Sequence, residues 1–132
     1  MIRKGTFVLI MLIPMLGCVQ KRTVSFDSDS WKKDMHGCNE ERLGLYSIII
    51  EKQGEILGMT NKQVIKVLGR PERNELYRRN QKFFIYNITP GEKCDRSDND
   101  RQLFLFVRFN AVGLSQEVFV QESPTFKDSR ST

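Results

Sequence analysis

The stretch from Leu57 to Pro71, LGMTNKQVIKVLGRP, most constrains the fold because it holds both the start and the stop signals of one short helix. Thr60 with Gln63 three residues later predicts a capping box at the start. Gly69 can take the left-handed conformation after the last turn, and the proline that follows prevents continuation. A helix of about nine residues is unstable alone. It must therefore pack against other parts of the chain.

Length and composition fit a single globular domain. The chain has 132 residues, of which 39% are hydrophobic and 28% are charged, as in an ordinary folded protein. The formal net charge of +5 falls to +3 when a leader that contains Arg3, Lys4 and no acid is removed. A nucleic-acid-binding face concentrates more positive charge than this, so we expect no nucleic-acid partner.

The first residues have the layout of a secretory signal. Arg3 and Lys4 precede an apolar run over 7–16, which is too short to span a bilayer. Gly17-Cys18 follows and resembles the lipobox of bacterial lipoproteins, in which the cysteine is acylated and becomes the mature N-terminus. We therefore expect a signal peptide over 1–17 and a membrane anchor at Cys18, because several acyl chains together anchor stably. The alternative is a secreted protein with an incidental Cys18.

Two further cysteines, Cys38 and Cys94, remain after Cys18 is set aside for lipid. An even number of cysteines in an exported protein predicts a disulfide between them. Such a bridge closes a loop of roughly 57 residues, which the chain-entropy model values at about 4 kcal/mol. Neither cysteine stands in a CxxC motif, so the sequence does not support redox catalysis.

The pattern before the short helix predicts a tether and a second helix. Residues 18–30 have no apolar period and read as a lipidated tether, followed by Trp31, which we expect to pack on the domain. Asn39 is the expected N-cap of a helix that runs to about Gln53. Together with the short helix it should form a helical hairpin. The expected apolar face of the longer helix consists of Leu43, Tyr46, Ile49 and Ile50.

After Pro71 the period changes from helical to strand-like. Residues 82–88, 103–109 and 114–121 are rich in β-formers and are separated by turn signals. The predicted fold is therefore α+β with the order α-α-β-β-β, a helical hairpin packed on a three-stranded antiparallel sheet over 31–121. The segment 122–132 has too little apolar content to dock, and we expect it to be disordered.

The order of these features resembles the SmpA/OmlA (BamE-like) family of outer-membrane lipoproteins, over about 57–121. The cysteine pair and the polar loop at 92–102 are not part of the family pattern. A two-helix, three-strand unit also occurs in β-lactamase-inhibitor-like proteins, so the fold alone permits another partner. The motifs that carry the resemblance are Gly58-Met59-Thr60, Gln63-Val64, Leu68-Gly69-Arg70-Pro71, the aromatic strand that ends near Tyr86, and the hairpin from Phe109 to Gly113.

The resemblance implies a lipid-anchored, non-catalytic scaffold protein of the bacterial outer membrane, with an envelope protein as partner and a role in β-barrel assembly or envelope integrity. The alternative is a surface-exposed inhibitor or immunity-type protein that binds an enzyme. His36 is the only histidine, which argues against a metal site with several histidines and against a triad. There is no glycine-rich phosphate loop. We expect no enzyme activity, cofactor, metal or small-molecule substrate.

A partner-binding surface is predicted on the sheet face that two short helices leave uncovered. The strand at 103–109 is apolar on both faces, so Phe104 and Phe106 should be partly exposed there. The basic residues Arg78, Arg79 and Lys82 should lie beside them, and aromatic and arginine side chains are favoured in interfaces. The alternative is that Trp31 and the polar loop close over this face.

Overall fold

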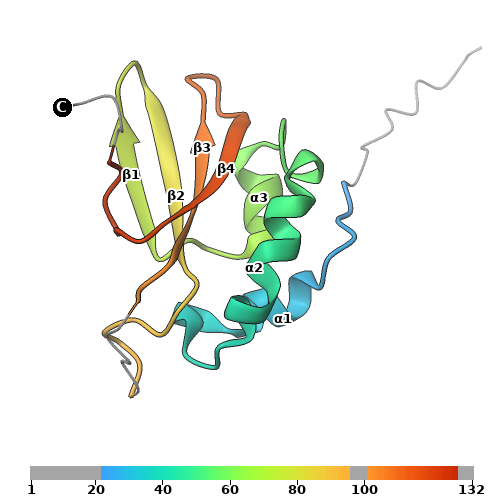
Figure 1. Ribbon diagram of the computed structural model, residues 1–132. Coiled ribbons are helices and arrows are strands. Elements are labelled where there is room, and N and C mark those ends of the chain that lie inside the picture. The colour runs from blue at the N-terminus through green and yellow to red at the C-terminus, as the bar shows by residue number, and fades with distance from the viewer. Residues whose placement is uncertain (1–21, 96–100, 128–132) are drawn as a thin grey trace, which may run out of the picture.

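The computed structural model describes residues 22–95 and 101–127 and shows a layer of helices on one face of an antiparallel sheet (Figure 1). The expected signal peptide and Cys18 lie outside the described residues. The helices are α1 (Ser28–Lys33), α2 (Glu41–Glu51) and α3 (Asn61–Leu68), with the short 3-10 turns η1 (Met35–Gly37) and η2 (Gln53–Glu55). The strands are β1 (Arg73–Tyr77), β2 (Gln81–Asn87), β3 (Phe104–Phe109) and β4 (Ser115–Gln121).

The sheet has four strands in the order β1-β2-β3-β4, and all neighbours are antiparallel. The α+β class is confirmed, but the expected number of three strands is wrong. Strands β2, β3 and β4 lie within one residue of the predicted ranges. Strand β1 was missed because its sequence RNELY mixes charged with apolar residues, and its Leu76 is 88% exposed. Pairing with β2, rather than burial of its side chains, defines this edge strand.

Helix α3 forms as its sequence predicts. The Thr60 hydroxyl accepts a hydrogen bond from the Gln63 N–H at 3.3 Å, and the Gln63 side chain accepts one from the Thr60 N–H at 2.9 Å. Gly69 ends the helix with a φ of +77°, which glycine adopts at little cost. The chain before the helix is tied to the start of β4, because the Gly58 N–H donates to the Ser115 carbonyl at 2.8 Å.

Helix α2 begins and faces the core differently from the prediction. Its N-cap residue is Glu40, which makes no capping hydrogen bond with its side chain, rather than Asn39. Leu43 is 40% exposed, whereas Arg42 is 2% exposed and Ile49 is fully buried. The apolar residues of this helix surround most of its axis, so the sequence pattern does not select one face. The buried stripe contains an arginine in place of the expected leucine.

Helix α1 packs against both α3 and α2, and the expected helical hairpin of α2 and α3 is not confirmed. Trp31 of α1 is fully buried in the main core, as expected. The described part of the predicted tether also contacts the domain, since Phe26 is 6% exposed and the Ser25 hydroxyl donates to Glu55 at 2.6 Å. The folded region therefore begins earlier than residue 31.

The main core lies between the helices and the sheet. Among the described residues, no helix has the length and apolar content that crossing a bilayer requires.

Candidate functional site

The turn between β1 and β2 carries the basic side chains that the sequence indicated. Tyr77 pairs with Gln81, so Arg78, Arg79 and Asn80 form the loop, and all three are exposed. Arg79 and Asn80 have φ values of 55° and 59°. This left-handed region costs a residue other than glycine roughly 1–2 kcal/mol. The hairpin thus presents two adjacent guanidinium groups on a strained backbone.

The three basic side chains of this hairpin have different surroundings. Within the described residues, Arg78 and Arg79 form no ion pair with a carboxylate. The Arg78 guanidinium lies 6.0 Å from the centre of the Tyr77 ring. Lys82 is partly buried, and its ammonium lies 5.2 Å from the centre of the Phe84 ring on the helix side of the sheet. The structure therefore brings Arg78 and Arg79 together at the tip and sets Lys82 back along β2.

Phe104 and Phe106 are not exposed. They are 7% and 0% exposed, so the expectation that they form an accessible patch beside the basic residues is wrong. Tyr86 is fully buried, and it lies on the opposite, helix-covered face, where its hydroxyl donates to the Gly69 carbonyl at 2.8 Å. Both faces of the central strands are therefore core.

A second apolar layer covers the sheet face opposite the helices. Phe126 packs against this layer, and it comes from the segment 122–132 that was expected to be disordered. Figure 1 shows this C-terminal segment, in dark red, running from the end of β4 past β1. One aromatic residue among polar ones gives no periodic signal, so the sequence did not indicate this contact. Residues 122–127 form no helix or strand, and 128–132 lie outside the described residues. The layer consists of Phe83, Ile85, Phe104 and Phe106, packed with Tyr77, Phe119 and Phe126.

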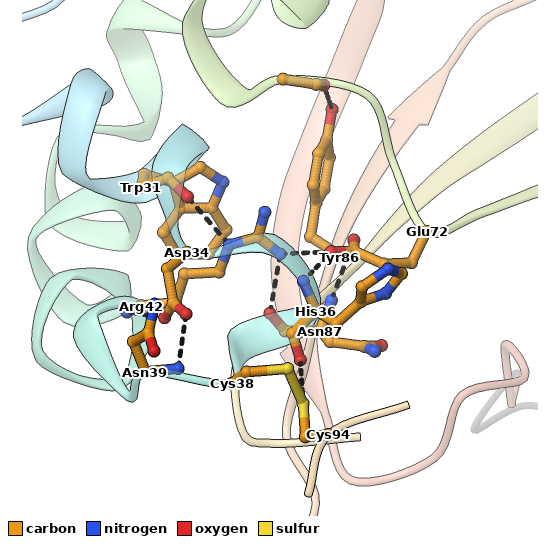
Figure 2. A network of polar contacts seen from close by, with 11 residues as sticks. Trp31, Asp34, His36, Cys38, Asn39, Arg42, Glu72, Tyr86, Asn87 and Cys94 are labelled. Atoms are coloured by element: carbon orange, nitrogen blue, oxygen red, sulfur yellow. Dashed lines mark hydrogen bonds and ion pairs between the residues drawn. A yellow bond between two sulfur atoms is a disulfide. The ribbon is translucent and has the colours of Figure 1, made fainter. Parts of the chain in front are cut away.

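The arginine buried in α2 occupies the centre of a polar network that sequence reasoning missed (Figure 2). The Arg42 guanidinium donates to Glu72 at 2.6 Å, to the Trp31 carbonyl at 3.0 Å and to the Asn87 carbonyl at 3.0 Å. It also lies 4.9 Å from the centre of the Trp31 ring and 5.9 Å from that of Tyr86. This one side chain therefore joins α1, α2, the start of β1 and the end of β2.

The carboxylate of Asp34 supplies the missing cap of α2. It is fully buried and accepts hydrogen bonds from the Asn39 N–H at 2.7 Å and the Arg42 N–H at 3.0 Å. The helix dipole also favours a negatively charged group at this N-terminal end. The sequence does contain a signal for this buried face of α2. Positions 42, 46 and 49 share one helical face as well as the predicted positions 43, 46, 49 and 50 do.

The predicted disulfide between Cys38 and Cys94 is confirmed, with a Cα–Cα distance of 5.3 Å. It ties the end of η1 to the loop after β2. Next to it lies a cavity of about 340 Å³ whose lining includes His36, Glu72 and Asn87. The Glu72 oxygens already accept hydrogen bonds from the His36 N–H at 3.0 Å and the Asn87 N–H at 3.3 Å. The described part of the chain contains no cluster of three or more metal-ligating side chains.

The titratable groups with shifted pKa values serve structural contacts. Burial raises the pKa of Tyr86, and the charge of Glu72 adds to the effect, so the phenol stays protonated and donates its hydrogen bond. Hydrogen bonds from Ser25 hold the pKa of Glu55 below its usual value. Hydrogen bonds from Ser30 do the same for Asp27, the N-cap of α1. None of the three lines the cavity beside the disulfide.

The described residues form a small α+β domain with two exposed arginines, Arg78 and Arg79, at the turn of its β1–β2 hairpin. Residues 57–118 match the family model described as the outer membrane protein assembly factor BamE domain. The match spans α3 and β1 to β3 and continues into β4. The resemblance that the motifs indicated is thus confirmed for residues 57–118, which match a BamE domain. Comparisons with curated proteins and with solved structures gave no match.

Proposed function

We propose that this chain is a lipid-anchored, non-catalytic scaffold protein of the bacterial outer envelope that acts as an accessory of outer membrane β-barrel assembly. The BamE domain at residues 57–118 carries this proposal, because the family is described as an assembly factor of outer membrane proteins. The buried polar network around Arg42, in which the guanidinium donates to Glu72 and to two backbone carbonyls, supports a structural role for the charged interior residues.

The N-terminal sequence supports anchoring through Cys18. A charged start, an apolar run and Gly17-Cys18 follow one another as in a bacterial lipoprotein precursor. The first described residue, Arg22, already contacts the domain, since its guanidinium donates to the Leu57 carbonyl at 3.4 Å. Four residues reach at most about 14 Å. The anchor would therefore hold the helix side of the domain close to the membrane and leave the β1–β2 hairpin on the side away from it (Figure 1).

Replacement of Cys18 tests the anchor. The Cys18→Ala variant should accumulate as unprocessed precursor or leave the membrane fraction, whereas wild-type protein should stay in that fraction after a salt wash. Unchanged processing and unchanged fractionation of Cys18→Ala would rule out lipidation at this position.

The partner-binding surface that we propose is the basic hairpin with Arg78, Arg79 and Lys82. Exposed charges at an interface mainly accelerate association and select the partner. The two arginines are exposed and lack an ion pair within the described residues. They are therefore available to carboxylates of an envelope protein.

Co-purification from detergent-solubilised membranes tests the function. Wild-type protein should recover outer-membrane barrel assembly proteins, and the Arg78→Glu/Arg79→Glu variant should recover much less of them. Lys62→Glu/Lys66→Glu is the matched control, because it makes the same charge change at exposed positions of α3. Recovery of a soluble or host enzyme instead would favour the inhibitor alternative and contradict the proposal.

A further inference from the structure

The second apolar layer contains a seat for one aromatic ring. Phe126 occupies it, stacked on Phe83 with a centroid distance of 4.6 Å and an interplanar angle of 27°. Tyr77 and Phe119 contact the same ring edge-on at 5.1 and 5.9 Å. We define Tyr77, Phe83 and Phe119 as the aromatic seat. They come from β1, β2 and β4, so the seat crosses the sheet face opposite the helices.

The segment that delivers Phe126 is attached mainly through this ring. Within the described residues, its other polar contacts lie at the surface. They include a hydrogen bond from the Gln121 side chain to the Lys127 carbonyl at 3.3 Å and an exposed ion pair between Arg101 and Glu122 at 2.7 Å. An exposed ion pair contributes little. The main core lies on the other face of the sheet, so Phe126 can leave the seat while the helices stay packed.

We propose that the aromatic seat binds an aromatic side chain of an extended segment from an outer-membrane barrel precursor, and that Phe126 is its intramolecular competitor. The identity of this partner rests on the proposed function. Strands of such barrels alternate apolar and polar residues and carry aromatic girdles. β1 is an edge strand beside the seat, so an extended segment can pair with its backbone while an adjacent pocket receives a side chain.

Competition by Phe126 lowers the apparent affinity for the external segment. If the seat is open about a tenth of the time, removal of the competitor tightens binding about tenfold. The probe is a short fluorescein-labelled peptide in which phenylalanine and tyrosine alternate with serine and threonine. Fluorescence anisotropy with the purified domain should show about tenfold tighter binding to Phe126→Ala than to wild-type protein. Lys127→Ala, an exposed neighbour, should bind like wild type.

Two further measurements locate the binding in the seat. A probe with alanine in place of its aromatic residues should not bind either protein. An unlabelled peptide with the sequence of residues 121–127, QESPTFK, should displace the probe from Phe126→Ala. Equal affinity of wild type and Phe126→Ala, binding of the alanine probe, or failure of QESPTFK to compete would overturn the proposal. Far-UV circular dichroism verifies that Phe126→Ala is folded. If it is not, competition by QESPTFK with wild-type protein decides by the same criterion.

These assays use purified protein and peptides, so their failure is separable from failure of the proposed function. Loss of the assembly proteins in co-purification would contradict the function, whereas a negative peptide result would leave the co-purification result unchanged.

Discussion

Arg42 shows how one charged residue can be accommodated in a small core. Its side chain is 2% exposed and its partner Glu72 is 9% exposed. Burial of two charges is costly unless both are paired and their remaining hydrogen-bonding positions are filled. Here the guanidinium is shared by Glu72 and two carbonyls, and the carboxylate also accepts two backbone N–H groups. The pair is thus neutral, and Nε and Nη1 of Arg42 and both oxygens of Glu72 have hydrogen-bond partners.

Loss of this arginine should destabilise the protein strongly. Arg42→Met leaves the Glu72 carboxylate buried without its cation, and breaking a buried pair from one side costs about 3–5 kcal/mol. Urea unfolding should show this loss. Arg108→Met is the control, because Arg108 pairs with the half-exposed Glu117 at 3.0 Å and such a pair contributes at most about 1 kcal/mol. Equal costs for the two variants would contradict the assigned role of Arg42.

Glu55 should make the attachment of the N-terminal segment depend on pH. Its pKa in the folded protein is lowered by hydrogen bonds from Ser25. A lowered pKa means that the contact stabilises the fold fully above the usual value of 4.5 and that this contribution is lost as the pH falls through the folded pKa. Hydrogen exchange of the Ser25 amide, corrected for intrinsic rates, should therefore lose protection in acid.

The Glu55→Gln variant is the control for this titration. Its side chain has no charge to lose, so the protection of the Ser25 amide should not change over the same acid range. Asp27→Asn leaves Glu55 intact and should keep the pH dependence at Ser25. A wild-type amide whose protection is constant through the acid range would contradict the assignment to Glu55.

The secondary-structure elements differ in how well their sequences predict them. α3 was predicted with both ends because capping and stop signals are local. β2, β3 and β4 were predicted because they combine β-forming residues with turns between them. β1 and the face of α2 depend on tertiary contacts: β1 forms by pairing with β2, and α2 is oriented by Arg42 and by a carboxylate eight residues before it. Such partners are invisible in a window of neighbouring residues.

The turn of the β1–β2 hairpin should become more stable when its strained residues are replaced by glycine. Arg79→Gly relieves the positive φ of an arginine, and the net gain is about 0.5–1 kcal/mol after the greater flexibility of glycine in the unfolded chain is subtracted, but binding to the partner should be lost. Asn80→Gly should gain less, at most a few tenths of a kcal/mol, because asparagine adopts the left-handed region more readily than arginine does. Thermal unfolding measures the gains in stability and co-purification measures the loss of binding.

Arg78→Gly is the matched control at the same hairpin, because no positive φ is recorded for Arg78. Glycine should there lower the stability instead of raising it. If all three glycine variants destabilise the domain, the backbone of the turn is not strained in the protein.

At the scale of the molecule, the sequence predicted the fold more accurately than it predicted the candidate binding surface. The basic residues Arg78 and Arg79 are exposed as the sequence predicted, but the aromatic residues expected beside them are buried in the second apolar layer, where Phe106 stacks on Phe119 at 5.1 Å and Phe126 packs against the layer. The apolar patterns indicated a layer of two helices on one face of the sheet, whereas α1, α2 and α3 together form that layer. The patterns do not indicate which distant segment covers the other face, because a single ring attached by a polar segment has no pattern that marks it as core.

The disulfide should contribute a large share of the stability of the whole domain. The loop between Cys38 and Cys94 contains α2, α3, β1 and β2, so the bridge restricts more than half of the folded region in the unfolded state. The chain-entropy model gives about 4 kcal/mol, and measured values are often lower. We expect the Cys38→Ser/Cys94→Ser variant to lose about 2–4 kcal/mol in denaturant unfolding.

A second observable distinguishes this cause from damage to the folded core. An unbridged chain is more expanded when unfolded, so it exposes more surface and its m-value should rise as its stability falls. Reduction of the wild-type protein should reproduce both changes, whereas Cys18→Ala, made without its leader, should reproduce neither. Lower stability at an unchanged m-value would instead indicate that the substitutions disturb the contacts of η1 with the loop after β2. Two titratable thiols in the unreduced Cys18→Ala protein would show that the bridge is not formed.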